Sequence, residues 1–226
     1  MRKFLAIFAL ASVSLLAVSA LAKEFYWPMF MPAINNAPRT VVSAGRVWMD
    51  RNLGASRVAT SPTDSAGYGD LYQWGRLTDG HQNRTSPTTV LISTTDVPRH
   101  GHFIIAALDW RNPHNSNLWQ GVYGVNNPCP SGFRLPTAEE WEIERASWSS
   151  NDAAGAFASP LKLVLAGYRK SADGTLSNVD TRAGYWSSSV KNGLFPSSYF
   201  LNFSVDSASV SSFFRGSGFS VRCIME

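Results

Sequence analysis

The sequence predicts an α+β protein with long loops, one clear helix near residues 138–147 and an antiparallel sheet towards the C-terminus. Three observations support this fold class. One segment carries a complete helix-start signal. Apolar residues alternate along short segments of the last third, which is typical of strands. Residues 54–127 are rich in Gly, Pro, Ser, Thr, Asn and Asp with scattered aromatic rings, which indicates loops held by buried side chains.

Residues 1–22 have the layout of a secretory signal peptide. Arg2 and Lys3 precede an apolar stretch, and Ala20 and Ala22 supply the small residues of a cleavage site. An uncleaved membrane anchor is the alternative interpretation of such a run. No second long apolar run follows. We therefore expect an exported protein without a membrane span after signal cleavage, in the periplasm, at the cell surface or outside the cell.

An aromatic and proline-rich N-terminal arm is predicted for residues 23–42. Its segment 25–32 (FYWPMFMP) cannot form a regular helix because of the two prolines. The segment either packs on the domain in an extended form or lies exposed, and an exposed apolar segment would favour an oligomer. The folded domain is predicted to cover residues 43–226, with a first strand near 46–50.

The two cysteines, Cys129 and Cys223, are expected to form one disulfide, because an even count in an exported protein favours a bond over a metal site. Cys223 shares its strand parity with Phe219 and Val221, which places it on the apolar face. Closing a loop of this length would stabilise the fold by about 4 kcal/mol. Two buried free thiols are the alternative.

Local signals define the elements after residue 127. Thr137 and Glu140 form a capping box, which predicts a helix from about Ala138 to Ser147. The alternation over 161–165 predicts a strand, and Asp173-Gly174 marks a hairpin. A further strand is predicted around 199–205, with the odd-numbered residues on its apolar face. The last third should therefore be mostly antiparallel sheet.

The net charge of the chain is only a weak indication of its binding partners. Lys and Arg number 20 and Asp and Glu number 16, for a formal net charge of +4, and Arg2 and Lys3 belong to the predicted signal peptide. No basic cluster of the kind that follows a phosphate backbone is visible. Nucleic acid is therefore not an expected partner.

Six segments, in order and spacing, resemble the Fibrobacter succinogenes major paralogous domain family. They are RVWMDRNLG (46–54), GDLYQWG (69–75), NPCPSGFRLPTAEEW (127–141), LAGY (165–168), YWSS (185–188) and GFSVRC (218–223). The resemblance runs from about residue 43 to the C-terminus. It implies a C-type-lectin-like fold of the branch shared with formylglycine-generating enzymes. Some relatives in that fold group are surface-displayed binding proteins whose C-terminal segment is diversified by retroelements and presented on a rigid sheet.

The corresponding stretch of this chain, residues 185–219, is dense in Ser, Tyr, Phe, Asn and Gly, which suit an adaptable binding surface. An ordinary antiparallel sheet with one solvated face has the same composition. Outward parity and loop positions give the candidate ligand-binding residues, which are Tyr185, Trp186, Lys191, Phe195, Ser198, Phe213 and Arg215. Tyr185 and Trp186 are also candidates for buried framework.

No catalytic residue is predicted. An oxidase of the formylglycine-generating type needs neighbouring thiols, whereas Cys129 and Cys223 are far apart in sequence. A Gly-x-Ser-x-Gly unit between a strand and a helix is also absent. The acids that could serve a glycosidase single out no pair, and those of the helix are expected to be solvated. They are Glu139, Glu140, Glu142, Glu144, Asp50, Asp70, Asp79 and Asp109.

No cofactor is expected. His100 and His102 would lie on one side of a strand, and His81 and His114 are isolated in polar loops, which is too few ligands for zinc. Calcium has hard oxygen ligands available in the loops, but the Glu-Pro-Asn and Trp-Asn-Asp signatures of calcium-dependent lectins are absent. Those oxygen ligands are Asp64, Asp70, Asp79, Asn83, Asp96 and Asp109.

The sequence thus predicts an exported ligand-binding module of the receptor or adhesin type, with a protein or glycan as its partner. The resemblance leaves open that it is a variable protein of a diversity-generating retroelement. One alternative is an enzyme, a hydrolase or oxidase, acting on cell-envelope or extracellular polymers. The other is a structural envelope protein without a specific ligand.

Overall fold

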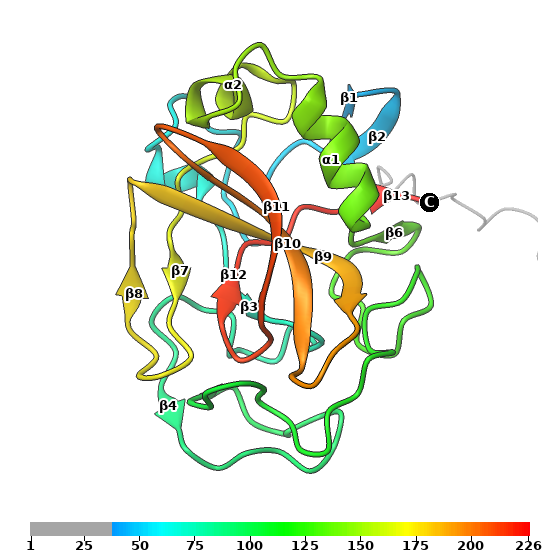
Figure 1. The fold of residues 1–226 in the computed structure, drawn as a ribbon, viewed down its shortest axis with the longest axis vertical. Helices are drawn as coiled ribbons and strands as arrows, with labels where there is room; N and C mark the ends of the chain where they lie inside the picture. Colours follow the sequence, from blue (N-terminus) through cyan, green and yellow to red (C-terminus); the bar gives the residue numbers. More distant parts are fainter. Residues whose placement is uncertain (1–37) are drawn as a thin grey trace, which may run out of the picture. The chain divides into compact units, whose positions relative to one another are not determined.

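The computed structural model describes residues 38–226, so the predicted signal peptide and most of the predicted arm lie outside the described residues. This part of the chain is strand-rich, with two short α-helices and mainly antiparallel sheets (Figure 1). The predicted α+β class is confirmed. Neither α-helix within 38–226 has the length and apolar character that a membrane crossing requires.

The largest regular unit is the antiparallel sheet predicted for the last third of the chain. It consists of β9 (Arg182–Lys191), β10 (Ser197–Ser204) and β11 (Ala208–Phe214), with β10 in the middle. Phe200 pairs with Trp186 on one side and with Ser211 on the other. The pairing of β9 with β10 shifts between Ser198 and Phe200, where β9 advances four residues against two of β10, so a bulge interrupts this ladder without changing which residues share a face.

Helix α1 (Ala138–Ala146) begins where the capping box predicts. Thr137 Oγ1 accepts a hydrogen bond from the Glu140 amide at 3.1 Å, and Glu140 Oε2 accepts one from the Thr137 amide at 2.8 Å. Ser147 is the C-terminal cap. The shorter α2 (Ala153–Ala158), which the sequence did not indicate, is capped by the Asp152 carboxylate. α1 packs against all three strands of the C-terminal sheet (Figure 1).

The two ends of the described chain meet in a second sheet. β1 (Thr40–Ser43), β2 (Arg46–Met49), β13 (Ile224–Met225) and β6 (Phe133–Arg134) lie in that order. The strand predicted near 46–50 is confirmed. Because β1 pairs with β2, Thr40 belongs to the folded domain, which begins earlier than the predicted boundary at residue 43.

A third sheet has the order β3 (Tyr72–Gln73), β12 (Gly218–Phe219), β7 (Tyr168–Arg169) and β8 (Leu176–Ser177). β7 and β8 form the predicted hairpin, with Gly174 at a φ of 70° in its turn. The remaining elements are the parallel pair β4 (Thr88–Thr89) and β5 (Phe103–Ile104) and the 3-10 turn Ser65–Gly67.

The strand predicted over 161–165 is wrong. Lys162 has a φ of 51°, which breaks an extended run, and the neighbouring amides bond to separate partners. Leu163 N donates to Ala156 O and Leu165 N to Pro62 O. The segment is nevertheless buried, including Val164, which alternation had placed on the opposite face.

The disulfide between Cys129 and Cys223 is present, with the two Cα atoms 5.9 Å apart. Cys223 is fully buried, as predicted. The residues on either side of it are buried too, because this last segment of the chain runs between other elements rather than along a solvated edge. The bond therefore joins the end of the loop-rich region to the centre of the domain.

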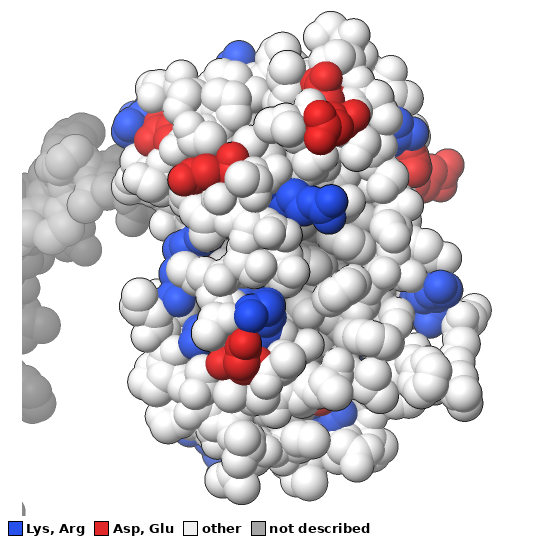
Figure 2. Space-filling model, turned by 60° about the vertical axis from the view of Figure 1, so that its left-hand side comes forward, with Lys and Arg blue, Asp and Glu red and all other residues white. Residues whose placement is uncertain are grey.

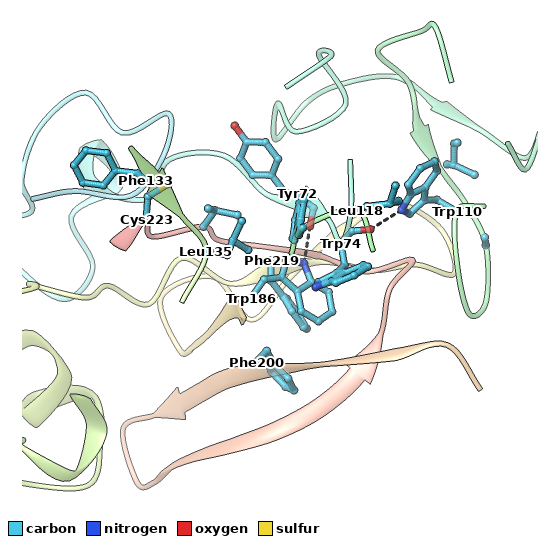
Figure 3. Packing of buried hydrophobic residues seen from close by; sticks show 14 residues of the cluster. Tyr72, Trp74, Trp110, Leu118, Phe133, Leu135, Trp186, Phe200, Phe219 and Cys223 are labelled. Carbon is cyan, nitrogen blue, oxygen red and sulfur yellow. Dashed lines mark hydrogen bonds between the residues drawn. The ribbon is translucent and has the colours of Figure 1, made fainter. Parts of the chain in front are cut away.

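Aromatic side chains form the centre of the core (Figure 3). Trp186 lies against Phe219 with ring centroids 4.6 Å apart, and its indole N–H donates to Tyr72 O at 2.8 Å. Trp110 Nε1 donates to Trp74 O at 2.7 Å. The prediction that buried rings hold the loops is confirmed for five of six residues, Tyr68, Tyr72, Trp74, Trp110 and Trp119. The sixth, Tyr123, is exposed.

Candidate functional site

The two faces of the C-terminal sheet pack against different elements of the fold. Tyr185, Leu201 and Phe203 lie on the face that packs against the helices, in one hydrophobic cluster with Trp141 of α1. Phe200 and Trp186 lie on the opposite face, where they meet Phe219 of β12. β12 covers only part of this second face, so an open strip remains beside it.

A groove of about 250 Å³ occupies this strip. Its floor is formed by Phe200, Phe213 and Phe219. The Phe200 and Phe219 rings are stacked with centroids 4.7 Å apart, and Phe213 lies 5.7 Å from Phe219. Gly184 of β9 lies behind the Phe219 ring, and a Cβ at this position would come within 2.8 Å of that ring. The missing side chain therefore allows Phe219 to take its place in the floor.

Polar side chains surround the aromatic floor. They come from β7, from the residue after β8 and from all three strands of the C-terminal sheet, and they are Tyr168, Asn178, Arg182, Asn202, Ser211 and Ser212. Tyr168 packs edge-on against Phe219 at 5.7 Å. Within residues 38–226 these six side chains donate and accept no hydrogen bond with other protein groups. Their polar atoms are therefore free to bind a ligand.

A second hollow of about 560 Å³ continues the groove towards the turn between β9 and β10. It shares Ser212 and Phe213 with the groove and adds Lys191, Phe195 and Phe214. The Phe195 and Phe214 rings are 6.4 Å apart, and Phe214 lies 5.9 Å from Phe213. A continuous row of aromatic rings thus leads from an exposed turn to the buried core.

The structure brings three of the seven predicted ligand-binding residues to this surface. Lys191, Phe195 and Phe213 are exposed and line the second hollow, and Phe213 also belongs to the floor of the groove. The side chains of these three residues are accessible to a ligand in solution.

The other four are buried and cannot contact a surface ligand. Tyr185 hydrogen-bonds to Val164 and Asn52 inside the helix-facing cluster, and Trp186 is fully covered by the second face, so both are framework. Ser198 and Arg215 contact each other in the interior through an Nε to Oγ bond of 3.1 Å. Ser198 lies on the same face of the sheet as Phe200, and both faces are covered there, which explains why outward parity was a wrong guide.

Sequence reasoning missed most of the groove. Tyr168, Asn178 and Arg182 belong to segments that meet the sheet only in the folded chain. Asn202 was detectable, because it lies on the polar parity of the strand predicted around 199–205. Phe200 also carried a signal, since a large apolar residue on that polar parity indicates a second covered face.

Several titratable groups lie in structural networks outside the groove. His81 is fully buried, not isolated in a polar loop, and its Nδ1 lies 2.6 Å from Asp79 Oδ1. Burial lowers the pKa of His81 to about 4, so the ring is neutral at pH 7. The pKa of Asp79 is held at about 2 by His81 and Arg76 despite its partial burial. Burial raises the pKa of Asp109 to about 7.

The prediction that the acidic residues of the helix are solvated is wrong for two of them. Glu140 is buried and accepts hydrogen bonds from Arg134 at 2.7 and 2.9 Å, and Glu144 is buried beside Trp148. His100 and His102 do lie together, with ring centroids 5.2 Å apart, outside any strand. Among residues 38–226, no three His, Cys, Asp or Glu side chains are grouped to hold a metal ion.

The face of the molecule shown in Figure 2 has no large patch of one charge. Figure 2 shows Lys, Arg, Asp and Glu side chains scattered singly or in small mixed groups over one face of the molecule.

No model of a known protein family, no curated protein and no solved structure matches this chain. The candidate site is therefore defined by its own geometry.

Proposed function

We propose that this chain is an exported ligand-binding module with a C-type-lectin-like fold, akin to the Fibrobacter succinogenes major paralogous domain family, and that it binds a protein or glycan in the groove of its C-terminal sheet. One observation carries the proposal. The groove combines an aromatic floor of Phe200, Phe213 and Phe219 with polar side chains that have no hydrogen-bond partner within residues 38–226.

This combination suits recognition because the two parts do different work. The exposed Phe213 ring supplies rigid apolar area that gains from leaving water, and the mostly buried Phe200 and Phe219 rings support it. Aromatic faces pack well against the C–H face of a sugar or an apolar peptide side chain. The polar rim of Arg182, Asn178 and Asn202 fixes the orientation of the ligand. The sheet beneath is held by a ladder on each side of β10, so the floor is preorganised.

The test measures binding of the purified protein to arrays of glycans and of cell-surface proteins, with two variants beside it. Ser211→Trp places a large ring in the groove. Ser209→Trp is the matched control, because Ser209 is an exposed serine of the same strand and face outside the groove. We expect a specific ligand that the wild type and Ser209→Trp bind and Ser211→Trp does not. Equal binding by all three, or no ligand at all, would contradict the proposal.

A further inference from the structure

A separate hollow of about 590 Å³ lies among the loops between β2 and β5. It shares no residue with the groove or its extension. Glycines form much of its wall, and the side chains that matter for its chemistry are Ser56, Asp70, Asn83, Arg84 and Thr85. This hollow is therefore a candidate for a second ligand, independent of the proposed function of the groove.

Two glycines set the shape of the wall. Gly54 has a φ of 79°, and a Cβ there would overlap the carboxylate of Asp70. Gly69 has a φ of 65°, and a Cβ there would overlap the Leu53 carbonyl oxygen. The loops can therefore cross in direct backbone contact. As a result, the Asp70 carboxylate is held against the backbone at the edge of the hollow.

The Asp70 carboxylate has no hydrogen bond and no ion pair with any residue of 38–226, although it is partly buried. Burial raises the pKa of this carboxyl, and the charge of Arg84 opposes that rise. Partly buried carboxylates are normally paired, because removing a charge from water costs free energy. Asp70 is thus a negative charge in a hollow wall with room for a hydrogen-bond donor.

Arg84 supplies the opposite charge in the same wall. Its Nη2 donates to Ala166 O at 2.7 Å, and its guanidinium lies 5.4 Å from the centre of the Tyr68 ring. It forms no ion pair within the described part of the chain, and Nη1 is buried without a hydrogen-bond partner. Arg84 lines the hollow, and its guanidinium keeps one buried donor without a partner among the described residues.

The two charges decide which ligand fits. A ligand with a single charge is attracted by one of these groups and repelled by the other, whereas a ligand with both charges gains from both. We propose that this hollow binds a small zwitterion of the α-amino acid class, with its ammonium group at Asp70 and its carboxylate at Arg84. Because Nη1 is covered in the unliganded protein, the guanidinium turns towards the hollow on binding. Ser56, Asn83 and Thr85 are available to contact the side chain.

The test is calorimetric titration of the purified protein with glycine, L-alanine, L-serine, L-glutamate and L-lysine. Ethylamine and propionate are titrated as analogues that carry only one of the two charges. We expect at least one amino acid to bind and both analogues to bind far more weakly. Asp70→Asn should weaken that binding about tenfold or more, because it removes a charged hydrogen-bond partner while keeping the shape. Asp206→Asn, an exposed acid far along the chain, is the matched control and should bind like the wild type.

Three outcomes would overturn the proposal. The first is that none of the five amino acids gives a heat of binding at about 10 mM, which corresponds to negligible affinity. The second is that ethylamine or propionate binds as tightly as the amino acids. The third is that Asp70→Asn binds them as the wild type does. The groove variant Ser211→Trp should bind the amino acid normally. The experiments therefore distinguish a failure of the groove proposal from a failure of the amino-acid proposal.

Discussion

The loop-rich region between β2 and β6 and the C-terminal sheet are stabilised in different ways. In the sheet, the backbone groups of β9, β10 and β11 bond to one another along two ladders. In the loops, buried side chains bond to the backbone instead. Trp119 Nε1, for example, donates to Asn126 O at 2.8 Å, and Trp74 Nε1 donates to Ser187 O at 2.9 Å. The two regions thus provide hydrogen-bond partners for their backbone groups in different ways.

Buried arginines extend this difference. Arg76 donates to the carbonyl oxygens of His100 and His102, and Arg169 donates to those of Ser86 and Gly174. One guanidinium thus donates hydrogen bonds to several loop carbonyl groups at once. A single substitution in this region removes several backbone contacts, whereas an outward substitution in the sheet leaves the ladder intact. The sheet is therefore the region that tolerates change at its surface, as a ligand-binding face requires.

The largest effect is expected from the disulfide that ties the end of the loop-rich region to the centre of the domain. Cys223→Ser removes the disulfide and should lower the free energy of unfolding by about 4 to 5 kcal/mol, because the open loop has more freedom when unfolded. Urea unfolding in oxidising buffer measures the change. Cys129→Ser should behave in the same way, and so should the double variant. A wild-type midpoint in any of them would show that the bond does not stabilise the fold.

Arg222→Met tests how far the loops depend on a guanidinium. Arg222 is buried and donates to Asn52 Oδ1, Met49 O and Leu161 O. Methionine fills similar space but leaves these acceptors without donors, so we expect a loss of about 4 kcal/mol. The control is Arg182→Met in the exposed rim of the groove, where we expect a change within about 0.5 kcal/mol. Equal losses in the two variants would remove the distinction between the regions.

The pH dependence of stability tests the network around His81. The pKa of His81 is about 4 in the folded protein and 6.5 in its ordinary state, so the unfolded chain binds a proton that the folded protein refuses. Its contribution is present above pH 6.5 and is lost as the pH falls to 4, a loss of about 3 kcal/mol. Asp109 acts in the opposite direction, because its pKa is raised to about 7.

Comparing the wild type with His81→Gln separates the contribution of His81 to the pH dependence of stability from that of Asp109. Both proteins are unfolded in urea at pH 7, 5.5 and 4. We expect His81→Gln to be less stable at pH 7, since it disturbs the bonds to Asp79 and Gln73, but to lose less stability as the pH falls. If the two curves run parallel, His81 does not resist protonation in the folded state.

Local signals in the sequence were sufficient for the features that depend on neighbours in the chain. The capping box at Thr137, the hairpin at Gly174 and the inward parity of Cys223 all follow from residues a few positions apart. The α+β class followed from such elements. These are the parts of the fold where short-range geometry decides the outcome.

The site depended on contacts that no local pattern contains. The groove exists because β7 and β12 reach one face of the C-terminal sheet, and Gly184 matters only because Phe219 arrives beside it. Ser198 is buried because Arg215 covers its face of the sheet, which alternation cannot reveal. Arg215 was predicted to be exposed, since its partners in Asn115 and Ser116 belong to a loop far away in the sequence.

The smallest expected effect concerns a regular element, the start of α1. Thr137→Ala removes one of the two capping hydrogen bonds and should cost about 1 kcal/mol. Urea unfolding measures it against Thr63→Ala, an exposed threonine without a side-chain hydrogen bond in the described structure. The cost is small because α1 is also held by Trp141, whose indole N–H donates to Trp186 O at 3.1 Å. A loss as large as that of Arg222→Met would mean that regular elements depend on single side chains as much as the loops do.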